Sequence, residues 1–223
     1  MPDWMFEVLS EARLREYARY TRGDLVQAAR LYRWNIKASK ALFEPLHWFE
    51  VALRNAMHRE LTAHYGRADW WIVAPLNDGG ARRIRDARAK CRNEGKAGTP
   101  DQIVAELSLG FWRSLLVRSY DRTLWVPTLR HAFPCYGGRR DALDDAVWSL
   151  VLLRNRVMHH EPIHHRHLAE DHDKLYTTMG YLNQDLAKEI RMTDDFPAVL
   201  AARPDSLRGR LPRRGSERRN PRA

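Results

Sequence analysis

Arg154, Asn155 and His159 lie close together in the segment LLRNRVMHHEP. Arginine binds phosphate through a planar fork of N–H donors, and histidine is the side chain whose unperturbed pKa lies near neutral pH. Cleavage of RNA without a metal needs a base for the ribose 2′-hydroxyl, an acid for the leaving 5′-oxygen, and a cation beside the phosphorane. Asn155 can orient the imidazole or donate to a phosphate oxygen. These residue types would therefore suit phosphodiester cleavage.

The three residues are predicted to end a long helix that spans about residues 139–160. Arg154 lies on the apolar face of this helix, where a charged side chain seldom occurs without a partner or a purpose. Asn155 and His159 are neighbours on the helix surface, whereas Arg154 and His159 lie about 140° apart around an ideal helix. The long reach of arginine, or distortion of the last turn before Pro162, must bring them together. Spacing alone more often has a structural explanation, in which Arg154 pairs with a buried acid and His159 is an ordinary surface or core histidine.

Three segments carry a more specific pattern. The first holds a Trp-Asn pair, then FE-x-x-LRN and then YG; the second has aromatic residues and leucines after a glycine; the third has an Arg-Asn pair followed by His and Pro. They are YRWNIKASKALFEPLHWFEVALRNAMHRELTAHYG, LSLGFWRSLL and LRNRVMHHEPI, and they span about residues 32–163. In this order they resemble the hallmark elements of the Abi-like (abortive infection) family of the HEPN superfamily of helical ribonucleases.

This resemblance implies an all-α fold, namely a HEPN-like antiparallel helical bundle with extra N-terminal helices. It implies a metal-independent endoribonuclease that needs no cofactor, acts on single-stranded or loop RNA, and uses Arg154, Asn155 and His159 as catalytic residues. A homodimer is also implied, in which two Arg–His motifs face each other so that one histidine acts as base and the other as acid. Relatives that transfer AMP carry a tyrosine where this chain has Glu161, so AMP transfer is not expected.

An earlier segment, VALRNAMHRE, resembles the catalytic one and contains Arg54, Asn55 and His58. Glu50 and Arg54 are four residues apart and so share a helix face. The family pattern includes Glu50, Arg54 and Asn55, and we interpret them as a buried polar network that braces the catalytic helix. A second catalytic site is the alternative. The residues predicted to support the catalytic ones are Glu50, Arg54, Asn55 and His160.

The net charge of +10 lies largely in the C-terminal segment, which would attract polyphosphate or, as the alternative, would only keep the protein soluble without binding a partner. The segment from Arg203 to Ala223 contributes +6, because it holds eight arginines against two acids. It has few large apolar residues and is predicted to be a disordered Arg-rich tail, residues 203–223, after a helical domain of residues 1–202. Candidate RNA-binding residues lie in a basic run and in a His-rich segment; they are Arg82, Arg83, Arg85, Arg88, His164 and His165. The basic run is equally open to interpretation as a solvated helix face.

Six histidines between positions 159 and 172 raise the question of a metal site. Their spacings match no common zinc motif and no cysteine accompanies them, so no metal ligands are predicted. A metal-dependent hydrolase built on this histidine run is kept as an alternative function. A second alternative is a catalytically inactive dimeric RNA-binding or interaction protein with the same helical bundle.

Helical periodicity predicts one domain without an internal boundary. The predicted helices cover about residues 3–20, 24–43, 45–66, 139–160 and 166–191, with a further helix start at residues 99–102. No segment is long and apolar enough for a membrane span or a signal peptide, and two distant cysteines do not make a disulfide framework. We therefore expect a cytoplasmic protein without membrane contact. Its expected role is an antiviral defence or toxin effector, for which a neutralising antitoxin is a candidate partner.

Overall fold

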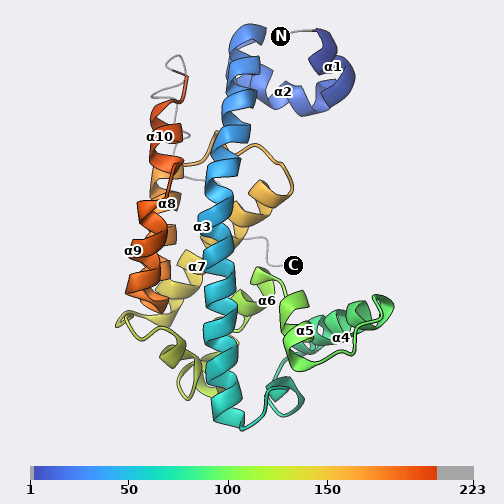
Figure 1. Cartoon of the computed structure of the whole chain (residues 1–223), viewed down its shortest axis with the longest axis vertical. Helices are drawn as coiled ribbons and strands as arrows, with labels where there is room; N and C mark the ends of the chain where they lie inside the picture. The colour runs from blue at the N-terminus through green and yellow to red at the C-terminus, as the bar shows by residue number, and fades with distance from the viewer. Residues whose placement is uncertain (1–2, 205–223) are drawn as a thin grey trace.

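The computed structural model describes residues 3–204, and in that part of the chain every regular element is helical (Figure 1). The predicted all-α class is confirmed. The longer elements are α1 (Asp3–Leu9), α2 (Glu11–Tyr20), α3 (Leu25–Tyr65), α4 (Asp78–Asn93), α5 (Pro100–Glu106), α6 (Leu109–Ser114), α7 (Arg140–Met158), α8 (Leu168–Leu182), α9 (Gln184–Met192) and α10 (Phe196–Ala201). Short helical turns cover Trp70–Ile72 (η1), Arg118–Tyr120 (η2), Asp121–Trp125 (η3) and Leu129–Ala132 (η4).

Helix α3 is the axis on which the other elements pack. It has 41 residues, which corresponds to a length of about 60 Å. Asp24 caps its start by accepting from two backbone N–H groups, and Gly66 ends it in the left-handed conformation. The sequence predicted two helices separated at Pro45, and this was wrong. Pro45 lies inside α3, where Leu42, Leu46 and Phe49 on either side are fully buried; their packing outweighs the lost hydrogen bond.

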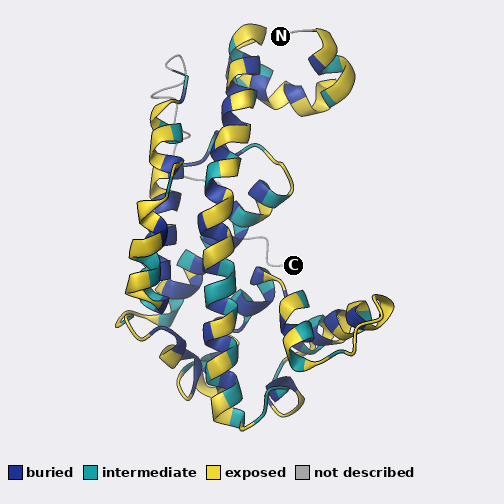
Figure 2. Cartoon of the chain, viewed as in Figure 1, coloured by how far each residue is buried: buried dark blue, intermediate teal, exposed yellow. Residues whose placement is uncertain are grey.

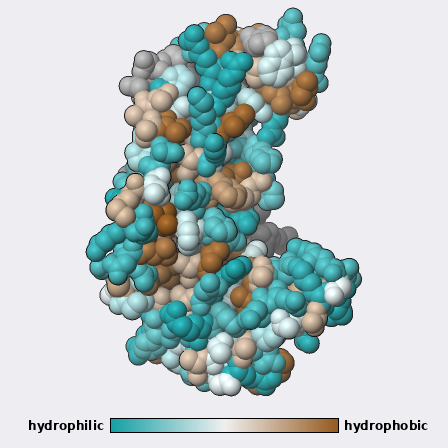
Figure 3. Space-filling model, in the orientation of Figure 1, coloured by the Kyte–Doolittle hydropathy of each residue, from teal (hydrophilic) through white to brown (hydrophobic). Residues whose placement is uncertain are grey.

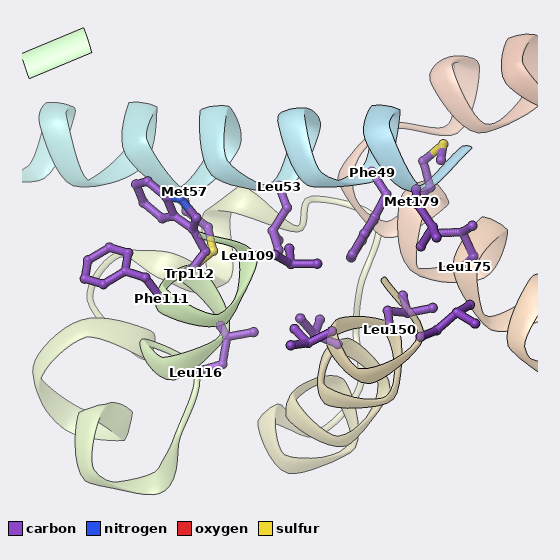
Figure 4. Packing of buried hydrophobic residues seen from close by; sticks show 14 of the residues in the cluster. Phe49, Leu53, Met57, Leu109, Phe111, Trp112, Leu116, Leu150, Leu175 and Met179 are labelled. Atoms are coloured by element: carbon purple, nitrogen blue, oxygen red, sulfur yellow. The ribbon is translucent and has the colours of Figure 1, made fainter. Parts of the chain in front are cut away.

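The core lies between α3 and the helices α6, α7 and α8. Figure 4 shows Phe49, Leu53 and Met57 of α3 pointing toward side chains of these helices, among them Leu109, Trp112, Leu150 and Met179. All of these side chains are buried. Burying a large apolar side chain stabilises the fold by about 1.5–3 kcal/mol. This packing fixes α7, which carries the predicted catalytic residues, against the middle of α3.

Several predicted boundaries shift in the structure. The predicted helix 3–20 breaks at Ser10, whose φ of 66° is incompatible with a continuous helix. The predicted helix 166–191 divides at Asn183, whose side chain accepts from the Leu186 N–H and starts α9. The predicted start at residues 99–102 is confirmed, because Thr99 and Gln102 form a capping box for α5. Helix α7 ends at Met158, close to the expected end before Pro162.

Arg203 belongs to the folded domain, so the prediction that the tail begins at residue 203 was wrong for this residue. Its guanidinium donates to the carbonyl of His164 at 2.9 Å and to the Tyr20 hydroxyl at 3.0 Å, and it lies 5.3 Å from the centre of the Trp34 ring. These long-range contacts are not visible in local composition. The remainder of the predicted tail, residues 205–223, lies outside the described residues.

Asn35 ties the segment that follows α7 back to α3. Its buried side-chain oxygen accepts from the backbone N–H of Ile163 at 2.8 Å and of His164 at 3.1 Å. Both donors are buried, and a buried donor that loses its acceptor is costly. Asn35 therefore fixes where the chain goes after it leaves the candidate site.

Replacing Asn35 by alanine should lower the free energy of unfolding by about 2–4 kcal/mol, because two buried N–H groups lose their acceptor. The measurement is urea unfolding followed by circular dichroism. Asn93→Ala, at an exposed position at the end of α4, is the control and should change stability by less than about 0.5 kcal/mol. Equal stability of the two variants would contradict the tethering role of Asn35.

Candidate functional site

The Arg154 side chain of α7 pairs with Glu50 of α3 through two hydrogen bonds. Its Nε donates to Oε2 of Glu50 at 2.8 Å, and its Nη2 donates to Oε1 at 3.3 Å. The two side chains are 26% and 18% exposed, so the pair lies at the edge of the core and reaches solvent. A guanidinium has five N–H donors, and in the described part of the chain this pairing engages two of them. The remaining donors can meet a ligand.

The other residues of the predicted bracing network separate. Nε of Arg54 donates to the Asn55 side chain at 3.4 Å, and Asn55 is exposed. Nδ1 of His58 accepts from the indole N–H of Trp70 at 3.0 Å, and burial lowers the pKa of His58, which keeps the ring a neutral acceptor. Glu50 therefore braces α7, whereas His58 anchors η1. Glu50 and Arg54 remain adjacent on α3 at a spacing of four residues.

Asn155, His159 and His160 are exposed where α7 ends. The last turn closes through backbone hydrogen bonds from His159 to Asn155 (2.9 Å) and from Glu161 to Arg156 (2.8 Å). His160 has a φ of 57°, in the left-handed region that non-glycine residues seldom adopt, and its carbonyl accepts from the side chain of Arg13. The chain thus turns sharply here and leaves the His159 ring at an open helix end.

This arrangement contains a group that can bind phosphate and a group that can act as an acid or a base. A guanidinium held by a carboxylate presents donors for a phosphate at a fixed place, and an imidazole is the side chain that most often serves as general acid or base in enzymes. The structure brings Arg154 and Glu50 into contact. It places Asn155 and His159 on neighbouring positions of the same helix end. Convergence of Arg154 and His159 on one phosphate stays a prediction.

The predicted RNA-binding arginines lie on α4, which forms a lobe with α5 beside the main bundle (Figure 1). Arg82, Arg85 and Arg88 are exposed and Arg83 is half-buried. In the described part of the chain no salt bridge neutralises these four, whereas Lys90 of the same helix pairs with Glu106 at 2.6 Å. The first turns of α4 thus present a net positive face.

The His-rich segment does not form one cluster. His164 is 1% exposed and lies between the rings of Tyr17 and Tyr20, so its predicted contact with RNA is wrong; His165 is half-buried. Nε2 of His172, in α8, lies 2.5 Å from a carboxylate oxygen of Asp194. His159 and His160 are exposed at the end of a different helix, α7. Within residues 3–204, no three His, Cys, Asp or Glu side chains gather as a group that could hold a metal ion.

Asn35 and Trp34 are the structurally important residues to which sequence reasoning gave no role of their own. Both occur in the Trp-Asn pair of the first quoted segment. Trp34 donates its indole N–H to the carbonyl of Val199 at 2.8 Å, and Asn35 holds the segment after α7. The sequence feature that could have identified them is a polar residue next to a tryptophan on an apolar helix face.

Comparisons with models of known protein families, with curated proteins and with solved structures give no match to this chain. The resemblance described above therefore rests on its three segments alone. Among the described helices, none combines the length and the apolar character that crossing a lipid bilayer requires.

His164 makes the stability of the fold sensitive to acid. Burial, aided by the nearby His165 and Arg203, lowers the pKa of His164 to about 3. Between pH 6.5 and this value the unfolded chain binds a proton at His164 that the folded chain does not. The contribution of His164 is thus fully present above about pH 6.5 and is lost as the pH falls.

Lowering the pH from 7 to 5 should therefore cost about 2 kcal/mol of unfolding free energy through His164. The test compares urea unfolding at both pH values for wild type and His164→Phe, which replaces the imidazole with an aromatic ring that cannot be protonated. His131→Phe, at an exposed position, is the matched control and should behave as wild type. The same acid-induced loss in His164→Phe as in wild type would refute this role.

Proposed function

We propose that this protein is a metal-independent endoribonuclease of the HEPN type that cleaves single-stranded or loop RNA. The observation that carries the proposal is the Arg154–Glu50 pair, which holds a guanidinium with unused donors at the edge of the core, within two helical turns of the exposed His159. The resemblance of three segments to the Abi-like family supports the same reaction.

The reaction is a transesterification followed by hydrolysis. A histidine takes the proton of the 2′-hydroxyl, the 2′-oxygen attacks phosphorus, and the P–O5′ bond breaks as a second group protonates the 5′-oxygen. The products are a 2′,3′-cyclic phosphate and a free 5′-hydroxyl, and water can then open the cyclic phosphate. Arg154 stabilises the negative charge of the phosphorane. Asn155 orients the ring of His159 or donates to phosphate.

Glu50 has a positioning role, and its negative charge requires compensation. A carboxylate next to the phosphate would repel it if Arg154 were the only cation nearby. Arg54, one turn from Glu50 on α3, supplies a second cation, and in the described part of the chain no salt bridge neutralises it. Two arginines against one glutamate give this site a net positive charge, as phosphate binding requires.

A homodimer would supply the second proton-transfer group, because two copies contribute two His159 rings to a composite site. Ile36 and Phe43 support a partner surface on α3, since these residues are 52% and 51% exposed. Phe43 lies seven and Ile36 fourteen residues before Glu50, and both are thus on the same side of the helix. Figure 2 shows exposed residues along this part of α3. Packing of these two residues against a second copy would remove their apolar surface from water.

The biological role follows from the family resemblance, by analogy. We propose a cytoplasmic effector of antiviral defence or a toxin, with an antitoxin as a neutralising partner. The alternative is a catalytically inactive RNA-binding or interaction protein with the same bundle. One observation favours that alternative: Glu50 already occupies two donors of Arg154.

The deciding experiment incubates end-labelled single-stranded RNA with wild type, Arg154→Ala and His159→Ala. We expect wild type to yield fragments with 2′,3′-cyclic phosphate ends, with or without a chelator. Each substitution should lower the rate by about 100-fold or more. His159 is exposed, so His159→Ala should melt within a few degrees of wild type.

His131→Ala, which removes an exposed histidine of η4, is the control and should cleave at the wild-type rate. Full cleavage by pure His159→Ala protein would reject the assignment. RNA that stays intact with wild type but binds in a salt-dependent manner would favour the inactive binding protein.

A further inference from the structure

A groove of about 760 Å³ lies between α3 and α10, away from the Arg154–Glu50 pair. Arg30, Arg33 and Lys37 of α3 line one side, and Val199 and Pro204 line the other. The three cations follow one another at spacings of three and four residues, so they share one face of the helix. The groove is thus a concave surface with a row of positive charges.

No ion pair neutralises this row in the described part of the chain. The groove has no acidic residue among the described residues that line it, and Arg30, Arg33 and Lys37 are exposed. No salt bridge of residues 3–204 involves any of the three, although the chain pairs arginines elsewhere, as at Arg113 and Asp144. Unpaired cations in a concave site concentrate anions.

The floor of the groove excludes recognition of a base by stacking. The indole N–H of Trp34 is engaged with the carbonyl of Val199 at 2.8 Å, and its ring is covered by the guanidinium of Arg203 at 5.3 Å. Trp34 is 4% exposed and has no open face for a nucleobase. The charged groups that the groove offers a ligand are Arg30, Arg33 and Lys37.

The row of cations is longer than the groove. Lys40 continues it into a smaller adjoining groove of about 290 Å³ that Lys37 also lines. Arg30 and Lys40 are ten residues apart on α3, which corresponds to about 15 Å along the helix axis. This length suits the phosphates of a chain better than those of one nucleotide. Figure 3 shows hydrophilic side chains along this upper part of α3.

The smaller groove carries more acidic than basic residues. Glu44, Asp194 and Asp195 line it together with Lys37 and Lys40. Their charge would turn a polyanion away from this groove and along α3. On α3, Glu50 and Arg54 lie ten and fourteen residues beyond Lys40, or about 15–20 Å. A strand held in the groove can thus reach the candidate catalytic site.

We infer that the groove between α3 and α10 binds backbone phosphates of single-stranded RNA, with Arg30, Arg33 and Lys37 as contacts, and guides the strand toward Arg154. The inference rests on the proposed function for the identity of the polyanion. Binding here is independent of base sequence, and it can be measured without cleavage.

The test measures anisotropy of a fluorescent single-stranded RNA over a series of salt concentrations. All proteins carry His159→Ala so that the RNA stays intact. Adding Arg33→Glu with Lys37→Glu should weaken binding about tenfold or more and should reduce the slope of log K against log salt by about 1.4, the value for two lost phosphate contacts. Adding Arg118→Glu with Arg122→Glu, two exposed arginines of η2 and η3, makes the same charge change and should weaken binding less than about twofold.

Equal weakening by the two pairs, or none by the groove pair, would overturn the inference. ATP provides a second arm: if it binds the His159→Ala protein and displaces the RNA, and the groove pair abolishes that binding, the groove is a site for a free nucleotide and the inference is wrong. Failure of the proposed function gives a different result, namely no cleavage by wild type, whatever the binding assay finds.

Discussion

The ion pair between Arg154 and Glu50 is the contact on which the rest of the site depends. Removing one partner of a half-buried pair would leave the other charge against the core without compensation, which is costly. The pair therefore fixes the side of α7 that faces α3 and the position of the guanidinium relative to the end of α7. Apolar packing brings the two helices together, and the ion pair places one charged group at a defined point on their junction.

The segment after α7 is held by contacts that leave the helix end open. Asn35 binds the backbone at Ile163 and His164, and Arg203 binds the carbonyl of His164 from the other end of the domain. The chain must leave α7 sharply to reach these partners, and it does so through the left-handed conformation of His160. These contacts keep the segment packed beside α3, and the exposed ring of His159 stays in solvent. Ile163 and His164 thus make the contacts that stabilise this segment, and His159 is the residue that a ligand can reach.

Local patterns allowed prediction of the features that depend on nearby residues. The end of α7 before Pro162 and the cap of α5 at Thr99 follow from backbone chemistry within a few positions. An acidic partner for Arg154 was expected from its place on a buried face, and the resemblance named Glu50 among the supporting residues. Their pairing across the α3–α7 junction required the three-dimensional structure.

The features that sequence reasoning missed depend on long-range packing. Pro45 is tolerated within α3 because of the core around it, and His164 is buried because two tyrosines from α2 enclose it. Arg203 is folded because Tyr20 and Trp34 receive it. The partners of His164 and Arg203 lie far from these residues in the sequence. The basic row on α3 was missed for a related reason, since its cations become a groove only when α10 packs beside them.

The most direct test follows the His159 ring by NMR while a single-stranded oligonucleotide that cannot be cleaved binds. The protein is labelled with carbon-13 at its histidine rings and titrated with a 2′-deoxy oligonucleotide, which cannot be cleaved, and the His159 signal is assigned by its absence in His159→Gln. If Arg154 holds a phosphate beside His159, this signal shifts on binding, and the shift is lost in Arg154→Gln. A His159 signal that does not move at saturation, or that moves equally in both proteins, would contradict the account.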